Sequence, residues 1–332
     1  MPTITDLNSF TPAWWLDNGH LQTLFPAICR PTPAIQTVRE RLPTADGDFV
    51  DIDYYGKGGW PLVILLHGLT GSSASIYIKG MQAALHSHGW RSVALNFRGC
   101  SGAANLTSRC YHSGETGDLE FLYRTLQQRH PGLPIAAIGF SLGGNVLLKW
   151  LGERGGDIGL CAAAAVSVPL RLDLCATRLD SGFSKQYRNR MLQELKAYMC
   201  FKHRHLQAIG KRGEAEKIAN LGNLEPLRSF WEYDQQVIAQ LYGFDGAADY
   251  YRRNSARQFL KDIRIPTLLI QAADDPFMTA EVLPRADELA DCISLEVTRG
   301  GGHVGFIGGN NPLRPNYWLE YRIPTFLRSY LD

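Results

Sequence analysis

The amino-acid sequence predicts an α/β fold in which a mostly parallel, doubly wound sheet of eight strands carries a helical insertion after its sixth strand. From Phe49 onward, short aliphatic runs alternate with longer amphipathic segments, which is the pattern of strands and helices in a largely parallel sheet. Between about Leu170 and Gln258 no strand pattern is visible, and the sequence is helical and polar. The 332 residues, 45% of them hydrophobic, suffice for the core of one large domain with such an insertion.

The expected strands follow from two kinds of pattern. Residues 37–44 and 49–56 alternate polar with apolar side chains, which predicts an antiparallel pair. Six later segments are continuous aliphatic runs, typical of buried parallel strands: 61–68, 91–99, 134–141, 160–168, 266–275 and 293–301. Helices are expected in five segments outside the insertion: 75–88, 117–130, 142–153, 280–290 and 316–331.

These elements predict a division of the chain into three parts. Residues 1–35 form an N-terminal clasp, and residues 36–170 together with 259–332 form the sheet domain. Residues 171–258 form a helical lid, because a loop of that length without secondary structure is improbable inside a compact protein.

Composition excludes several classes of protein. With 34 basic and 32 acidic residues, the formal charge of +2 gives no field that would attract nucleic acid or an anionic membrane. The seven cysteines are scattered and lack zinc-site spacing, which favours free thiols in a reducing compartment. The first residues lack the pattern of a signal peptide, and no apolar run is long enough to span a bilayer. We therefore expect a cytoplasmic protein without a transmembrane segment or a metal site.

A serine stands where an expected strand turns into an expected helix. The segment Gly139-Phe140-Ser141-Leu142-Gly143 fits G-x-S-x-G, the nucleophile elbow, in which a sharp turn exposes the serine at the carboxyl edge of a sheet. Small residues two positions before and after the serine let the two backbones approach each other. Both flanking segments match the context that this motif requires, so Ser141 is the predicted nucleophile.

Two partners for this serine follow in the order Ser, Asp, His that the elbow architecture requires. Asp274 and Asp275 end the strand 266–275, and His303 lies in a glycine-rich turn after the last strand. In hydrolases with such a strand, the acid commonly precedes a proline and two apolar residues, which selects Asp275. Asp274 is then a turn residue or a secondary acceptor. His303 is the predicted base, since a serine hydroxyl needs a base that a carboxylate orients.

The remaining elements of the predicted site are main-chain donors. The backbone N–H of Leu142, at the start of the helix, is expected to bind the developing oxyanion. The second donor should be the N–H of Leu69, in the loop after the strand 61–68. Alternatively, the loop of Leu69 is a turn without a catalytic role. His67, just before this loop, is interpreted as structural. Gly300, Gly301 and Gly302 are interpreted as residues that give conformational freedom to the loop that carries the histidine.

Five segments follow in order along the chain: HGLTGSS, NFRGCSG, GFSLGGN, ADDPFM and GGHVGFIGG. With them the sequence resembles the α/β-hydrolase fold superfamily, and more narrowly its YheT-like branch (AB hydrolase 4) of hydrolases and carboxylesterases. WWLDNGHLQTLFP and YHSGETGDLE are also similar to that branch, so the resemblance runs from about Trp14 to the end. It implies an α/β-hydrolase fold and a triad at Ser141, Asp275 and His303, and it relates the chain to eukaryotic lipases and yeast ethanol acyltransferases.

Several residues keep two interpretations. In the clasp, five apolar residues are expected either to pack on the sheet domain or to line an acyl pocket: Trp14, Trp15, Leu21, Leu24 and Phe25. Asn18 and His20 are expected to form a polar turn there. Aromatic residues of the lid enclose an acyl chain or form the core of the lid: Phe201, Phe230, Trp231 and Tyr242. Residues 202–205 (KHRH) are interpreted as a solvated helix face rather than a site for an anionic headgroup. The roles of His112 and Glu115 stay open, with Glu115 and Asp118 favoured as helix-entry residues.

The predicted reaction is hydrolysis of a carboxylic ester through an acyl-enzyme, without a metal or an organic cofactor. The predicted partner is a small-molecule ester, of short to medium acyl chains or of lipids, with transient lipid contact as an open possibility and no nucleic acid. Two alternatives remain: an alcohol O-acyltransferase that uses the same triad, and a non-catalytic binding module on the same fold. The sequence does not indicate the oligomeric state.

Overall fold

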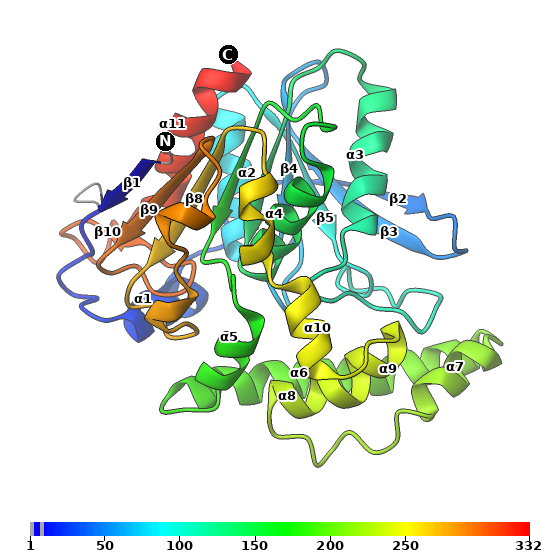
Figure 1. Cartoon of the computed structure of the whole chain (residues 1–332). Coiled ribbons are helices and arrows are strands. Elements are labelled where there is room, and N and C mark those ends of the chain that lie inside the picture. Colours follow the sequence, from blue (N-terminus) through cyan, green and yellow to red (C-terminus); the bar gives the residue numbers. More distant parts are fainter. Residues whose placement is uncertain (1–2, 7–9) are drawn as a thin grey trace.

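A sheet of nine strands forms the centre of the molecule in the computed structural model, which describes residues 3–6 and 10–332 (Figure 1). Its order is β1-β9-β8-β7-β6-β4-β5-β3-β2, and all neighbours are parallel except β2 with β3 and β3 with β5. The strands are β1 (Thr3–Asp6), β2 (Val38–Pro43), β3 (Phe49–Tyr55), β4 (Leu62–Leu66), β5 (Arg91–Asn96), β6 (Ile135–Phe140), β7 (Ala162–Val166), β8 (Thr267–Ala272) and β9 (Ile293–Thr298).

The predicted mostly parallel sheet is confirmed. Strands β2 to β9 are the eight expected strands, and β4, β6, β7 and β8 are buried along their whole length, as continuous aliphatic runs require. β1 adds an edge strand that the sequence did not predict, and it pairs in parallel with β9. Residues 1–2 and 7–9 of the predicted clasp lie outside the described residues.

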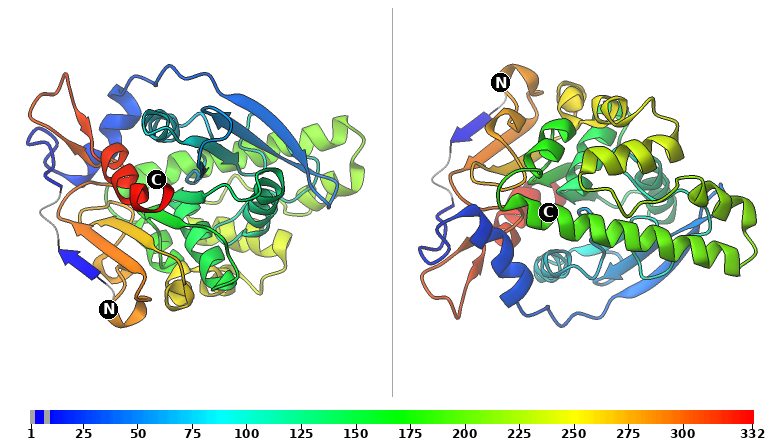
Figure 2. Two further views of the ribbon diagram at one scale, coloured as in Figure 1. Left: turned by 90° about the horizontal axis from the view of Figure 1, so that it is seen from above. Right: turned by 90° about the horizontal axis from the view of Figure 1, so that it is seen from below.

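Helices cover both faces of the sheet (Figures 1 and 2). α2 (Ile76–Ser87) and α11 (Leu319–Leu331) share one apolar cluster with the side chains of β4 and β6 that face them. α3 (Gly117–Arg129) and α4 (Leu142–Arg154) pack in the cluster on the other face. The doubly wound arrangement brings the carboxyl ends of the parallel strands to one edge, where ligands bind in such sheets.

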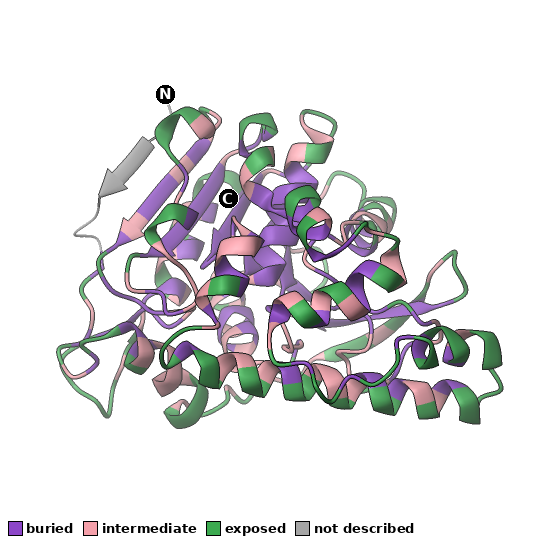
Figure 3. Ribbon diagram, turned by 60° about the horizontal axis from the view of Figure 1, so that its bottom comes forward, coloured by how far each residue is buried: buried purple, intermediate pink, exposed green. Residues whose placement is uncertain are grey.

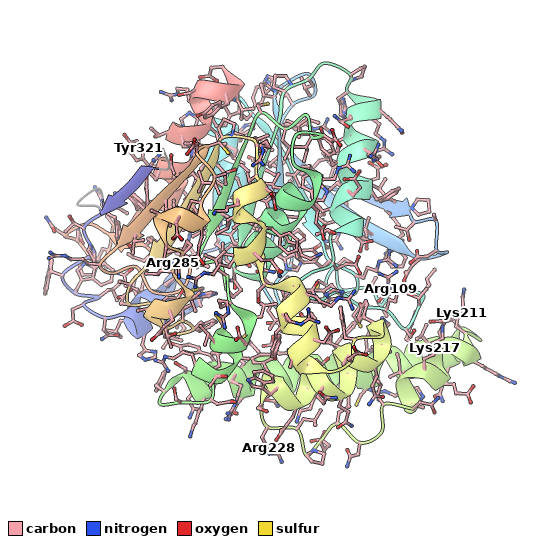
Figure 4. All side chains as sticks on the ribbon, in the orientation of Figure 1. Arg109, Lys211, Lys217, Arg228, Arg285 and Tyr321 are labelled. Carbon is pink, nitrogen blue, oxygen red and sulfur yellow. The ribbon has the colours of Figure 1, made fainter. Side chains whose placement is uncertain are left out.

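The segment between β7 and β8 is helical and lies across the carboxyl edge of the sheet (Figures 1 and 3). Its elements are α5 (Leu172–Arg178), α6 (Ser184–Ala208), α7 (Arg212–Ala219), α8 (Phe230–Tyr233), a π-helical turn (Asp234–Ile238), α9 (Ala239–Tyr242), α10 (Ala247–Asn254) and a 3₁₀ helix (Ala256–Asp262). Charged side chains such as Lys211, Lys217 and Arg228 are exposed on its outer side (Figure 4). None of the helices in the described part of the chain combines the length and the apolarity needed to cross a membrane.

One expected helix is wrong. Residues 280–290 form two short 3₁₀ helices instead, Ala280–Val282 and Ala286–Glu288. Pro284 separates them, and Leu283 before it is extended (φ −66°, ψ 133°). A proline removes a helical N–H and disfavours helical geometry in the residue before it, so the apolar spacing of this segment did not suffice.

The clasp contains a helix where a polar turn was expected. α1 (Gly19–Cys29) begins after Asn18, whose side chain accepts a hydrogen bond from the N–H of Leu21 (3.0 Å). The rings of Trp15 and Phe25 lie 4.8 Å apart and pack with a small apolar cluster. The expected packing is wrong for two of its members, because Trp14 is 71% exposed and Leu21 is 42% exposed.

Candidate active site

Ser141 lies in the sharp turn between β6 and α4. Its backbone has φ 52° and ψ −121°, a conformation that non-glycine residues rarely adopt. The N–H of Ser141 donates to the carbonyl of Val166 on the neighbouring strand (2.8 Å), which holds the turn in this strained geometry. Such strain persists only where the surrounding structure fixes it, and it concentrates at functional sites.

The glycines around the serine are required by close backbone contacts. A Cβ atom on Gly143 would lie 2.5 Å from the carbonyl oxygens of Leu66 and His67. A Cβ atom on Gly139 would lie 2.5 Å from the carbonyl oxygen of Gly143. Any side chain at these positions would therefore separate β6, α4 and the end of β4, and the spacing of the motif has a direct steric reason.

Ser141, His303 and Asp275 form one hydrogen-bonded chain. The Oγ of Ser141 lies 2.8 Å from Nε2 of His303, and Nδ1 of the same ring lies 2.8 Å from Oδ2 of Asp275. The ring of Phe277 stacks on the imidazole at a centroid distance of 4.0 Å and an angle of 17°. The side chain of Asp275 is 1% exposed and that of His303 is 10% exposed, so these hydrogen-bonded side chains are shielded from water but open to a small reactant.

The two neighbouring aspartates have different contacts. Besides its contact with His303, Asp275 accepts a hydrogen bond from the N–H of Phe277 through Oδ1 (2.8 Å). Asp274 accepts from the N–H of Gly302 (2.9 Å), and burial raises the pKa of its carboxyl. The structure thus brings Asp275, which the proline-containing pattern favoured, to His303, and Asp274 to the loop that carries the histidine.

Helix α1 holds this histidine loop from the other side, which the sequence did not predict. The N–H of His303 donates to Oγ1 of Thr23 (2.8 Å). The fully buried Gln22 donates to the carbonyl of Ile307 (2.9 Å) and accepts from its N–H (2.7 Å). A Cβ atom on Gly302 would overlap α1 at the carbonyl oxygen of Gly19. The loop glycines thus permit a close approach of α1, in addition to the positive φ of Gly301 and Gly302.

Two backbone amides lie near the serine, those of Leu69 and Leu142. Within the described part of the chain, neither the N–H of Leu69 nor that of Leu142 takes part in another hydrogen bond, and both residues line the cavity beside Ser141. Two tyrosines that the sequence did not single out fix the loop of Leu69: the N–H of Gly68 donates to the hydroxyl of Tyr77 (2.8 Å), and that of Thr70 to the hydroxyl of Tyr111 (2.9 Å).

His67 has a structural environment, as expected. It is fully buried and shares a hydrogen bond of 2.8 Å between Nδ1 and the carbonyl of Gly68, while Nε2 accepts from the N–H of Phe97 (3.2 Å). Burial lowers its pKa to about 4, so the ring is neutral near neutral pH. Its ring supports the loop of Leu69 from within the core.

The residues with open roles lie around the site rather than at the serine. His112 lines the same cavity, its Nδ1 accepts from the N–H of Gly114 (3.1 Å), and burial lowers its pKa to about 4. Glu115 pairs with Arg109 (2.6 Å), and Asp118 pairs with the buried Arg98 (2.7 Å). Both acids also lie at the start of α3, as expected: Asp118 stands in the first turn, and Glu115 accepts a hydrogen bond from the N–H of Gly117 (3.3 Å).

The histidine of the clasp and the basic stretch of α6 also have defined contacts. Nδ1 of His20, on α1, lies 3.1 Å from the hydroxyl of Tyr187, on α6. The expected solvated face of residues 202–205 is wrong at Lys202, whose side chain is fully buried and donates to the carbonyl of Ser108 (3.2 Å). A long side chain with a cationic end can be buried when carbonyl groups meet its charge.

A largely apolar cavity extends from Ser141 toward the helical segment. Phe230 lines it, whereas Phe201, Trp231 and Tyr242 do not. Trp231 instead donates to Thr177 (3.0 Å), and the hydroxyl of Tyr242 accepts from the N–H of Cys110 (2.9 Å). Among the residues that the structure describes, no group of three or more histidines, cysteines or acids is arranged to hold a metal ion.

Comparison with known proteins identifies the family. A family model described as alpha/beta hydrolase fold matches residues 61–309. The chain belongs to this family. It is 39% identical over 340 residues to "Putative esterase YheT" of Escherichia coli (strain K12), with 99% of this chain and 98% of that protein covered, so it also belongs to the YheT-like branch.

One further relative supports the family, and one solved structure supports the fold. "Phospholipase ABHD3" of Mus musculus is 30% identical over 341 residues, which cover 100% of this chain and 80% of that protein. The structure of esterase Pf2001 of Pyrococcus furiosus has a TM-score of 0.57 at 19% identity and covers 90% of this chain and 94% of its own; it bears on the fold alone. The chain is therefore a hydrolase of the α/β-hydrolase fold, similar to esterases and phospholipases.

Proposed function

We propose that this hydrolase cleaves carboxylic esters through an acyl-enzyme intermediate, with Ser141 as the nucleophile, His303 as the general base and Asp275 as the acid that orients it. The observation that carries the proposal is the continuous hydrogen-bonded chain of these three side chains, with two contacts of 2.8 Å. A serine hydroxyl becomes an effective nucleophile only when a base within hydrogen-bond reach removes its proton.

The first half of the reaction forms the acyl-enzyme. The Oγ of Ser141 attacks the ester carbonyl while Nε2 of His303 takes the hydroxyl proton. Asp275 holds the ring with its N–H toward Oδ2 and stabilises the imidazolium that forms. His303 then gives the proton to the departing alkoxide, and the alcohol leaves.

The amides of Leu69 and Leu142 are proposed to stabilise the tetrahedral intermediates. Both are free of other hydrogen bonds within the described residues, and the amide of Leu142 begins α4, where the helix dipole favours negative charge. Removing one donor of an oxyanion hole typically lowers turnover by about a hundredfold to a thousandfold. In the second half, His303 activates a water molecule that attacks the acyl-enzyme, and Ser141 regains its proton.

Two cavities meet at Ser141 and support an assignment of the two halves of an ester. The first is largely apolar and is enclosed by α5, α6, α8 and α10, which suits an acyl chain. The second lies between α1, α2 and α11 and includes the ion pair of Arg30 with Glu320, which suits a polar alcohol. The names of the relatives, an esterase and a phospholipase, support esters and lipid esters as substrates, and we propose short to medium acyl chains for them.

The helical segment is proposed to act as a lid over the first cavity. Residues 171–258 supply most of the apolar wall of this cavity, including Leu179, Met191 and Ile238. A segment of this kind excludes water from the acyl group, and it is expected to open for substrate and product.

All seven cysteines are free thiols, which supports a reducing compartment such as the cytoplasm.

The test uses the full chain and p-nitrophenyl butyrate. Ser141→Ala should reduce hydrolysis to below about one per cent of the parent rate, because removal of a triad member removes most of the catalysis. Ser87→Ala, an exposed position at the end of α2, is the matched control and should keep the parent rate. A Ser141→Ala protein with more than a few per cent of the rate would refute the assignment.

Two further measurements separate the alternatives. A fluorophosphonate probe should label the parent protein but not Ser141→Ala, and a parent protein that resists the probe would favour a non-catalytic binding module. With ethanol added, the butyrate should leave mainly as the free acid. Accumulation of ethyl butyrate as the main product would favour an acyltransferase.

A further inference from the structure

One carboxyl group borders the cavity that we assign to the acyl chain. Asp234 opens the π-helical turn between α8 and α9. Among the residues that line this cavity, all of which are described, Asp234 is the single carboxylic acid. Its side chain is partly buried, and the residue borders the cavity. A polar group in an apolar wall is costly unless it has a partner.

The contacts of Asp234 within the protein leave its binding capacity incomplete. Its Oδ2 accepts a hydrogen bond from the hydroxyl of Tyr251 (2.6 Å). Among residues 3–6 and 10–332, no other side chain donates to this carboxyl and no cation pairs with it. A carboxylate offers about four acceptor positions on its two oxygens, so most of its capacity is unused.

A second polar group lies beside it in the same wall. Tyr233 precedes Asp234 and lines the cavity, and no residue in the described part of the chain accepts from or donates to its hydroxyl. The wall of one cavity thus contains a carboxyl with unused acceptor positions and a hydroxyl without a partner among the described residues. π-Helical turns such as the one that begins here occur frequently at functional sites.

We propose that Asp234 binds a hydroxyl group on the acyl chain of the substrate, so that the enzyme prefers esters of hydroxylated alkanoic acids to esters of plain alkanoic acids. This inference rests on the proposed ester hydrolysis and on the assignment of the cavity to the acyl chain. On this proposal the hydroxyl lies away from the ester carbonyl, because Asp234 belongs to the helical segment, between α8 and α9, whereas Ser141 lies in the turn between β6 and α4.

A neutral hydroxyl fits this site better than an ammonium group. A cation would have to lose its hydration in a cavity whose wall is mostly aliphatic and aromatic, with one carboxyl as compensation. Burial raises the pKa of Asp234 to about 7 against the opposing effect of the Tyr251 hydrogen bond, so charged and neutral forms coexist near neutral pH. A hydroxyl can donate to the first form and accept from the second.

The experiment measures kcat/KM for pairs of methyl esters that differ by one hydroxyl. Hexanoate, octanoate and decanoate are each compared with analogues hydroxylated at the middle or the terminal carbon, and acid release is followed with a pH indicator. The parent enzyme should favour at least one hydroxylated ester by about tenfold to a hundredfold, which corresponds to one hydrogen bond to a charged group. Asp234→Leu should reduce that ratio to about one.

Matched variants assign the preference to the cavity. Asp245→Asn changes an exposed acid that follows α9, and it should keep the parent ratio. Asp234→Asn keeps the shape and part of the hydrogen bonding, so it should give an intermediate ratio even if Asp234→Leu does not fold. The proposal is overturned by parent ratios at or below one for every pair, by a ratio that survives in Asp234→Leu, or by a stronger preference for aminoalkanoate esters.

The outcomes also separate this inference from the function on which it rests. Equal rates on hydroxylated and plain esters would refute the proposed hydroxyl site but would be consistent with ester hydrolysis. A parent protein that hydrolyses no ester and is not labelled by a fluorophosphonate would refute both the hydroxyl site and the proposed ester hydrolysis.

Discussion

Thr23 provides a test of whether α1 positions the catalytic histidine. Thr23→Val preserves the shape of the side chain but removes the acceptor of the His303 N–H, a contact of 2.8 Å in a partly buried position. Leaving one such amide without a partner costs about 1 to 3 kcal/mol. If this cost falls on the loop conformation that aligns the imidazole, kcat/KM should fall by about fivefold to a hundredfold, since about 1.4 kcal/mol corresponds to tenfold.

The assay is the kinetics of p-nitrophenyl butyrate hydrolysis together with the thermal midpoint of unfolding. Thr23→Ser keeps the hydroxyl and should restore most of kcat. Thr325→Val is the matched control. The hydroxyl of Thr23 also donates to the carbonyl of Gly19, four residues earlier (2.6 Å), and the hydroxyl of Thr325 donates likewise to the carbonyl of Tyr321 (2.8 Å) on the exposed side of α11. A Thr23→Val enzyme whose kcat/KM stays within twofold of Thr325→Val would refute the positioning role of α1.

Three further outcomes follow from the site and its supports. Asp275→Asn should lower kcat by about ten-thousandfold while the fold persists, measured by kinetics and circular dichroism, because the ring of the histidine loses its orienting carboxylate. Gly143→Ala should lower the free energy of unfolding by about 1 to 3 kcal/mol or more in urea titration, since the new Cβ would lie 2.5 Å from main-chain oxygens. Burial lowers the pKa of His67 and of His112 from 6.5 to about 4, so the unfolded state binds more protons between these values and stability falls as the pH drops through this window. Between pH 7 and pH 5 each should cost about 2 kcal/mol of unfolding free energy, and a His112→Gln protein with an unchanged pH dependence would contradict this.

The sheet and the serine were predictable because their signals are local. The central parallel strands are short, buried on both faces and therefore aliphatic along their length, as β4 and β7 illustrate. The turn at Ser141 requires glycines at fixed offsets, since Gly139 and Gly143 touch main-chain atoms of neighbouring elements. Requirements of this kind act over five residues and are visible in any single sequence.

Other features depend on contacts between residues far apart in the chain, which no local pattern records. Nothing in the sequence around Thr23 indicates that it accepts a hydrogen bond from a residue 280 positions away. The burial of Lys202 depends on the carbonyl of Ser108, which accepts a hydrogen bond from its side chain. The polar pattern of residues 202–205 predicted a solvated helix face and could not indicate this distant contact. In residues 280–290 the apolar spacing favoured a helix, but the local restriction by Pro284 overrode it.

The proposed active site therefore divides into two parts with different sensitivities. The strained serine is fixed by its own turn and by β7, so changes in the helical segment should leave its geometry intact. The alignment of His303 depends on Asp275 and Asp274 after β8 and on Thr23 in α1, three contacts that come from two distant parts of the chain. Substitutions in α1 or in the loop after β8 should accordingly lower the rate of proton transfer while the serine stays in place. Fluorophosphonate labelling and turnover should then decrease in parallel in such variants, because both reactions need the hydroxyl proton to move to the imidazole.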